Sequence, residues 1–82
     1  MPRYFFDVYE GTKLIRDMEG VELPSLEAAK QQAHASLSDM LRDAGYVERG
    51  TDFRVSVRDN GGVRVIVSFA NPGFRTVANL PA

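Results

Sequence analysis

The stretch Asp17-Met18-Glu19-Gly20-Val21-Glu22-Leu23-Pro24-Ser25-Leu26-Glu27-Ala28-Ala29 decides the fold of this 82-residue chain. Gly20 supplies a position where the backbone can take a positive φ angle, and Pro24 biases Leu23 away from helical geometry. Ser25 is then a natural helix N-cap, with Glu27 placed favourably in the first turn. The stretch therefore turns a corner, starts a helix and joins two halves of the chain that each resemble a β-hairpin.

The segment from about Leu26 to Ala44 is predicted to be an amphipathic helix, with Gly45 as its terminator. Its apolar side chains fall on one stripe that is rich in alanine near its start, and small side chains let a helix backbone lie close to a sheet. The helix therefore covers one face of another element. The stripe comprises Leu26, Ala29, Ala33, Leu37, Met40, Leu41 and Ala44.

Four short β-strands are predicted around this helix, two on each side of it in the sequence. The first pair is rich in aromatic and β-branched side chains. The second pair alternates polar and apolar side chains, a pattern typical of strands with one buried face, and it is joined by Asn60-Gly61, a strong hairpin signal. The strands are residues 3–9, 13–16, 53–59 and 63–69, with loops at 17–24 and 46–52.

The predicted fold class is α+β: a ββαββ arrangement in which one helix packs on one face of a four-stranded antiparallel sheet. If the two hairpins meet through their strands 3–9 and 53–59, the strand order is 2-1-3-4. A single domain is expected over residues 1–70, and residues 71–82 are expected to form a tail that is loose or draped over an edge, anchored by Phe74 and Val77. The predicted inner layer of the sheet is Tyr4, Phe6, Val8, Phe53, Val55, Val57, Val63, Val65, Val67 and Phe69.

Composition argues for a small cytoplasmic protein that associates with itself. A chain of this length buries only about 60% of its unfolded surface, and small domains often add disulfides, metals or self-association. The sequence has no cysteine, so disulfides are excluded and a homodimer is expected. The net charge of −1 does not attract nucleic acid or anionic lipid. No apolar run is long enough to span a membrane, and the N-terminus lacks a secretory signal.

No catalytic, cofactor-binding or metal-binding residue is predicted. His34 is the only histidine, and the residues that flank it at helical spacing are Lys30 and Ser38, which do not complete a catalytic or metal site. The acidic loop 17–22 lacks the alternating oxygen ligands of a calcium loop. A small hydrolase or metal enzyme would need His34 and this loop brought together. We therefore expect a non-enzymatic protein without a cofactor.

The sheet face that points away from the helix is the predicted interaction surface. Arginine and aromatic side chains gather on this face, as they do at many protein interfaces. It suits self-association or contact with an unidentified protein partner. Sheet modules of this kind also stack single-stranded bases, which remains an alternative. The candidate interface residues are Phe5, Tyr9, Arg54, Arg58, Arg64 and Ile66.

Two sequence features carry a resemblance to a family: the aromatic run Tyr4-Phe5-Phe6 and the pattern Asp-x-x-Gly-x-Glu-Leu-Pro at 17–24, followed by an alanine-rich helix. They resemble a family of short, uncharacterised bacterial proteins of unknown function. The resemblance covers roughly residues 1–70 and implies no established activity. Members of that family often carry His at the position of Asp7 in this chain.

The helix start Ser25-Leu26-Glu27-Ala28-Ala29 is similar to that of antitoxin domains of the HicB type, which also place a proline-containing loop before it. Two predicted strands precede the helix in this chain, whereas such antitoxins have three. No DNA-binding helix-turn-helix or ribbon-helix-helix follows. An antitoxin-like module, the second alternative for this chain, would therefore be the protein-binding half alone.

Overall fold

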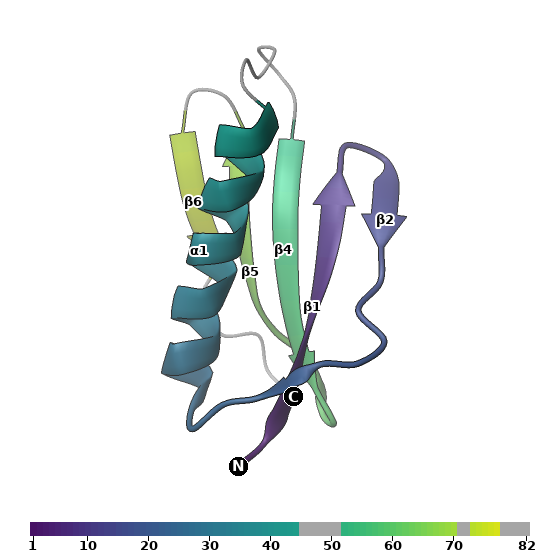
Figure 1. Cartoon of the computed structure of the whole chain (residues 1–82), viewed down its shortest axis with the longest axis vertical. Helices are drawn as coiled ribbons and strands as arrows, with labels where there is room; N and C mark the ends of the chain where they lie inside the picture. Colours follow the sequence, from purple (N-terminus) through teal and green to yellow (C-terminus); the bar gives the residue numbers. More distant parts are fainter. Residues whose placement is uncertain (45–51, 71–72, 78–82) are drawn as a thin grey trace.

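A computed structural model of the chain describes residues 1–44, 52–70 and 73–77. One helix packs on an antiparallel sheet (Figure 1), which confirms the predicted α+β class. The strands run in the order β2-β1-β4-β5-β6, and β3 also pairs with β1, so the order predicted for the four expected strands, here β2-β1-β4-β5, is confirmed. The elements are β1 (Arg3–Glu10), β2 (Lys13–Ile15), β3 (Val21–Glu22), α1 (Leu26–Ala44), β4 (Asp52–Asp59), β5 (Gly62–Ala70) and β6 (Gly73–Val77).

Two strands of the sheet are additions to the predicted four. β3 interrupts the segment expected to be a loop and pairs with β1 at Arg3 and Tyr4. β6 pairs with β5 within the segment expected to be a loose or edge-draped tail. The expected helix terminator Gly45, loop residues 46–51 and the side chains of Phe74 and Val77 lie outside the described part of the structure.

Helix α1 begins where the sequence predicts it to begin. Ser25 Oγ accepts a hydrogen bond from Ala28 N, and Ser25 O accepts one from Ala29 N, both at 3.1 Å. This is N-cap geometry, and it satisfies backbone N–H groups that have no partner within the helix. The helix lies over β4 and β5, while β1 and β2 extend beyond it to one side (Figure 1).

The hydrophobic core lies between α1 and the helix-facing side of the sheet. Small side chains at Ala29 and Ala33 let the helix approach β4 and β5 closely, and Leu37 fills the space beyond them; all three are fully buried. The predicted inner layer is confirmed except at one position. Its buried members are Tyr4, which is 5% exposed, and the fully buried Val55, Val57, Val65 and Val67, and its partly buried members are Phe6, Val8, Phe53 and Phe69.

The exception is Val63, which is 37% exposed. The register of β4 and β5 shifts here, because Val57 lies opposite Val65 whereas Arg58 lies opposite Val63. β5 therefore has one extra residue, Arg64, and this bulge puts Val63, the residue before it, on the other face of the sheet from the one that strict alternation predicts. The placement of Val63 in the inner layer was wrong for this reason.

The turn between β4 and β5 explains where the extra residue comes from. Asn60-Gly61 forms the predicted hairpin, but neither residue takes the positive φ angle that a type I′ turn requires. Gly62 takes it instead, with a φ angle of 109°. This arrangement is typical of a type I turn followed by a glycine in the left-handed region. Hairpin loops of this kind are accompanied by a β-bulge.

Candidate interaction surface

The sheet face that points away from α1, here called the helix-free face, consists of three rows of side chains across β1, β4 and β5. Residues directly opposite each other in a sheet share a face, so the register defines each row. The rows are Tyr9–Arg54–Ser68, Asp7–Ser56–Ile66 and Phe5–Arg58–Val63. Leu14 of β2 lies opposite Tyr9 and extends the first row to the edge of the sheet.

Two arginine–aromatic pairs flank the central row of this face. The guanidinium carbon of Arg54 lies 4.9 Å from the ring centroid of Tyr9, and that of Arg58 lies 4.5 Å from the ring centroid of Phe5. Both distances are within the range of cation–π attraction. The central residue Asp7 is only 6% exposed although it lies on the face away from the helix. The long side chains of the two outer rows therefore shield the middle of the face from water.

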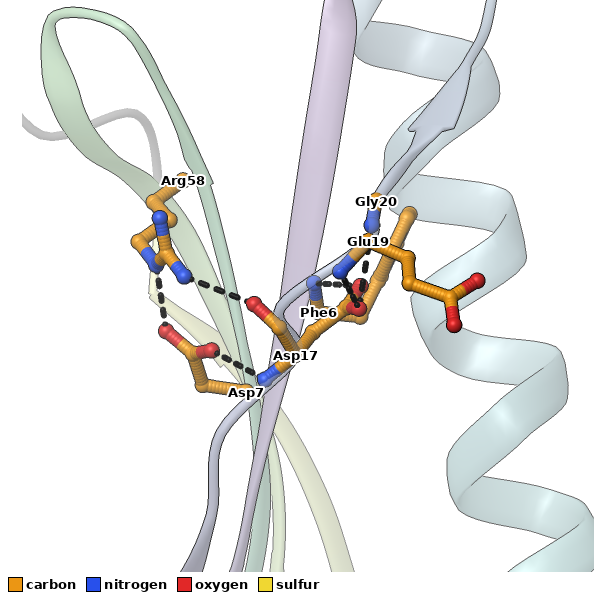
Figure 2. Close-up of polar contacts among 6 residues, drawn as sticks. All are labelled: Phe6, Asp7, Asp17, Glu19, Gly20 and Arg58. Carbon is orange, nitrogen blue, oxygen red and sulfur yellow. Dashed lines mark hydrogen bonds and ion pairs between the residues drawn. The ribbon is translucent and has the colours of Figure 1, made fainter.

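A buried ion pair occupies the centre of the helix-free face (Figure 2). Asp7 Oδ2 accepts a hydrogen bond from Arg58 Nε at 2.8 Å, and Asp7 Oδ1 accepts one from Asp17 N at 3.0 Å. Arg58 Nη2 in turn donates to Asp17 O at 2.9 Å. Buried charges are tolerated when paired and hydrogen-bonded in this way. The three residues join β1, β4 and the loop between β2 and β3.

The Asp17 carboxylate fixes the loop to the edge of β1. Its Oδ1 accepts hydrogen bonds from the backbone N–H groups of Glu19 and Gly20, and its Oδ2 accepts one from Phe6 N, all at 3.0 Å (Figure 2). Phe6 lies on β1 between the residues that pair with β3 and those that pair with β2, so Asp17 replaces a missing strand partner. Burial raises the pKa of Asp17, but these hydrogen bonds and the charge of Arg58 outweigh it and lower the pKa below its ordinary value.

Gly20 completes this loop because no other residue fits its position. Its φ angle is 72°, which confirms the predicted positive φ. A Cβ atom at Gly20 would lie 2.8 Å from Cε2 of Phe5 and 2.9 Å from the backbone oxygen of Tyr4. Asp17 and Gly20 of the Asp-x-x-Gly pattern therefore have a structural role, which is to hold the loop against β1.

Five of the six candidate interface residues lie together on the helix-free face: Phe5, Tyr9, Arg54, Arg58 and Ile66. Arg64 is the extra residue of β5, and its Nε donates to Asp59 Oδ1 at 3.0 Å and Oδ2 at 2.9 Å. Sequence reasoning missed Leu14 and Val63, which also belong to this face. The placement of Leu14 on this face follows from the register of the β1–β2 hairpin, whereas the placement of Val63 depends on the bulge.

All three candidate arginines have a carboxylate neighbour. Arg58 pairs with Asp7 and Arg64 with Asp59, while Arg54 Nε lies 3.5 Å from Asp52 Oδ2. The Arg54 nitrogen is buried and makes no hydrogen bond with the described residues. Because each positive charge is balanced nearby, the helix-free face carries no excess positive charge from these arginines.

His34 and the acidic loop do not form a metal site within the described residues. No group of three or more His, Cys, Asp or Glu side chains in that part of the chain could hold a metal ion. His34 is half-buried on α1, and both carboxylate oxygens of Asp17 already accept hydrogen bonds from backbone N–H groups. The described residues also contain no helix that is long and apolar enough to cross a membrane.

Most of the chain matches a known family model. Residues 3–70 match the model of a domain of unknown function, DUF6894. The chain belongs to this family. The expectation of a family of unknown function is thereby confirmed, and the matched part of this DUF6894 domain includes β1 to β5 and the whole helix-free face. No curated protein and no solved structure matches the chain.

Proposed function

We propose that this DUF6894 domain is a non-enzymatic interaction module that self-associates through the helix-free face. The observation that carries the proposal is the mixture of side chains there. Phe5, Tyr9 and Ile66 are half-buried, and Leu14 and Val63 are 47% and 37% exposed. These apolar groups surround a centre that is already shielded from water. Aromatic and arginine side chains are enriched at protein interfaces, whereas charged residues are depleted from their centres. The charges at the centre of this face, those of Asp7 and Arg58, are paired with each other.

A second copy of the chain is the partner that this face fits best. A small domain with its core on one side of a sheet gains stability when its other side is also covered. In a symmetric dimer both subunits contribute the same patch, so the charged side chains of one subunit face the same charged side chains of the other. The internal ion pairs of Arg54, Arg58 and Arg64 support this, because they leave little net charge to repel a second copy.

Binding of single-stranded nucleic acid is the alternative function. Phe5 and Tyr9 on the helix-free face favour it, because aromatic rings on a sheet face can stack bases. The arginines weaken it, since phosphate groups would compete with the carboxylates that already neutralise them. The antitoxin-like hypothesis rests on the helix start 25–29 and would make the domain a protein-binding module, which is the same class as our main proposal.

Light scattering coupled to size-exclusion chromatography tests the main proposal. The wild-type chain is expected to be a dimer at high micromolar concentration, and Ile66→Glu is expected to be a folded monomer. Ile66 is a better choice than Phe5, whose ring also contacts Arg58 and lies where a Gly20 side chain would be. Gln32→Glu, on the exposed side of α1, is the control and is expected to remain a dimer.

A wild-type chain that is monomeric at this concentration would contradict self-association. Fluorescence anisotropy with labelled oligothymidine would then test the alternative. Arg54→Ala is the suitable variant, because Arg54 makes a looser ion pair than Arg58 and its removal leaves the Asp7 network intact. Salt-dependent binding that this variant weakens would support the nucleic-acid function.

A further inference from the structure

The turn between β4 and β5 contains Asn60-Gly61, a dipeptide that is chemically reactive. Both residues are exposed to solvent. The backbone nitrogen of Gly61 can attack the side-chain amide of Asn60, because glycine has no side chain to obstruct the attack. Asn60 is therefore a candidate site of deamidation, a covalent change that needs water but no enzyme.

Deamidation replaces the side-chain amide of Asn60 with a carboxylate. The Gly61 nitrogen loses its proton to solvent base and forms a bond to Cγ of Asn60. The bond from Cγ to Nδ2 then breaks, and Nδ2 leaves as ammonia with a proton from water. Water opens the resulting cyclic imide at one of its carbonyl carbons, which gives aspartate or isoaspartate. The net reaction consumes water and releases ammonia, and nothing is oxidised or reduced.

In the folded chain the N–H group that must react is held by Asp59. Gly61 N donates a hydrogen bond to Asp59 Oδ1 at 2.8 Å. A charged acceptor makes this bond stronger than one to a neutral group, and the nitrogen must give it up before it can attack Asn60. The negative charge of Asp59 also disfavours removal of the proton, because a second negative charge would form beside it.

Arg64 holds the Asp59 carboxylate in this position. Its Nε donates to Asp59 Oδ1 at 3.0 Å and to Oδ2 at 2.9 Å. The Arg64 and Asp59 side chains are 26% and 22% exposed, so water reaches this ion pair only in part. Burial raises the pKa of Asp59, but its hydrogen bonds with Arg64 and Gly61 outweigh this and lower the pKa below its ordinary value. Asp59 is therefore ionised at neutral pH.

The glycine at position 61 is explained by the ion pair and not by its backbone conformation. Its φ angle is not positive, so other residues could adopt it. A Cβ atom at Gly61, however, would clash with Nη2 of Arg64 and lie 3.2 Å from Cζ of the same side chain. Gly61 thus leaves room for the guanidinium group that holds Asp59. The residue that makes the dipeptide reactive also allows the ion pair to form beside it.

We propose that the Asp59–Arg64 ion pair slows deamidation of Asn60 in the folded protein. Reaction then requires local opening of the turn, in which the hydrogen bond from Gly61 to Asp59 breaks. Deamidation places a second carboxylate beside Asp59, and isoaspartate also lengthens the backbone of the turn that precedes the β5 bulge. The proposal concerns this turn alone and does not depend on self-association through the helix-free face.

The test measures deamidation rates by mass spectrometry of chains incubated at mildly alkaline pH, with peptide mapping to locate the change at Asn60. Asp59→Ala is expected to react about tenfold faster than the wild type, because it removes a hydrogen bond to a charged group. Arg64→Gln keeps the carboxylate without its cation and is also expected to react faster than the wild type. Circular dichroism checks that both variants remain folded, and Arg64→Gln decides the test if Asp59→Ala does not fold.

A synthetic peptide of residues 56–66 gives the reaction rate without the rest of the sheet, and it is expected to react faster than the wild-type chain. Asp59→Ala in this peptide is expected to leave its rate nearly unchanged, because no fixed turn holds Gly61 there. Arg42→Gln breaks an exposed ion pair on α1 and is expected to react at the wild-type rate.

Three results would overturn the proposal. The first is a wild-type chain that deamidates at Asn60 as fast as the peptide does. The second is a folded Asp59→Ala or Arg64→Gln chain that reacts no faster than the wild type or than Arg42→Gln. The third is an equal acceleration by Asp59→Ala in the chain and in the peptide, which would assign the effect to local sequence and not to the folded turn.

Discussion

On the helix side of the sheet, four valines of β4 and β5 are fully buried beneath α1, whereas on the helix-free face Asp7 and Ser56 are 6% and 5% exposed with no helix above them. The same strands thus have two faces that exclude water by different means. Apolar packing against a helix buries the first face. The second is shielded by its own arginine and aromatic side chains, with a charge pair at its centre. The uncovered face of a small sheet can therefore exclude water at its centre without a helix above it.

The largest effect is expected from Leu37→Ala, which breaks the helix side. Leu37 is fully buried, so truncation removes packing and leaves a cavity that α1 and the sheet can fill only partly. We expect a loss of about 3 kcal/mol in the free energy of unfolding, measured by urea denaturation. Ser38→Ala, on the exposed side of the same helix, is the control and should change stability by less than about 0.5 kcal/mol. A loss at Leu37 as small as that of the control would contradict the core described above.

Asp7→Asn is expected to have the next largest effect because it breaks the centre of the helix-free face. The change removes the negative charge and leaves Arg58 half-buried without its partner. We expect a loss of about 2 kcal/mol, since a buried charged group that loses its partner retains its desolvation cost. Asp39→Asn removes a carboxylate from the exposed Arg42 ion pair and should cost less than about 0.5 kcal/mol. Equal losses in the two variants would mean that burial of the Asp7 pair has no energetic consequence.

Asp17→Asn is expected to have a smaller effect that depends on pH. An amide in place of the carboxylate would turn an N–H group toward Phe6 N or toward the loop N–H groups, so about 1–2 kcal/mol of stability is lost at neutral pH. Because the folded-state pKa of Asp17 is lowered, its stabilising contribution is complete above the unfolded-state pKa of about 3.9 and is lost as the pH falls through the lower folded-state pKa. Urea denaturation across this range should show the two proteins converging below about pH 4. A difference that stays constant with pH would contradict the role of the carboxylate charge.

The smallest effect is expected from Val63→Thr, which tests whether Val63 lies on the helix-free face. Val63 and Val65 occupy equivalent places in the alternating sequence pattern, yet Val63 is 37% exposed and Val65 is fully buried. A hydroxyl group at Val63 can bond to water, so we expect a change of less than about 0.5 kcal/mol. Val65→Thr buries a hydroxyl group and should cost about 1–3 kcal/mol. Similar losses at both positions in thermal denaturation would contradict the bulge at Arg64.

The elements that follow local rules could be predicted from the sequence. Three features depend on neighbouring residues, and each is found in the structure: the N-cap at Ser25, the positive φ angle at Gly20 and the alternation of side chains between the two faces along β4. The position of Val63 could not be predicted, because a period of two does not reveal an extra residue in a strand. β3 has only two residues and depends on its pairing with β1 rather than on its own propensity.

The candidate face was predictable in its composition but not in its internal contacts. Strand alternation places Phe5, Tyr9, Arg54 and Arg58 on one side of the sheet, as the register has them. The ion pair between Asp7 and Arg58 joins residues that are 51 positions apart in the chain, and no local pattern signals such a contact. This network could therefore be found only in the tertiary structure, which also shows that Arg58 already has a carboxylate partner.

The position of β1, which pairs with β2, β3 and β4, also affects how the chain is made. β1 is synthesised before β4, so its aromatic side chains leave the ribosome before the strand that pairs with them along most of its length. α1 likewise emerges before β4 and β5, the two strands on which it packs. The nascent chain cannot close its core until β5 has left the exit tunnel, and assembly is then a late step that joins distant segments. Until that point β1 is an exposed aromatic segment of the kind that chaperones bind.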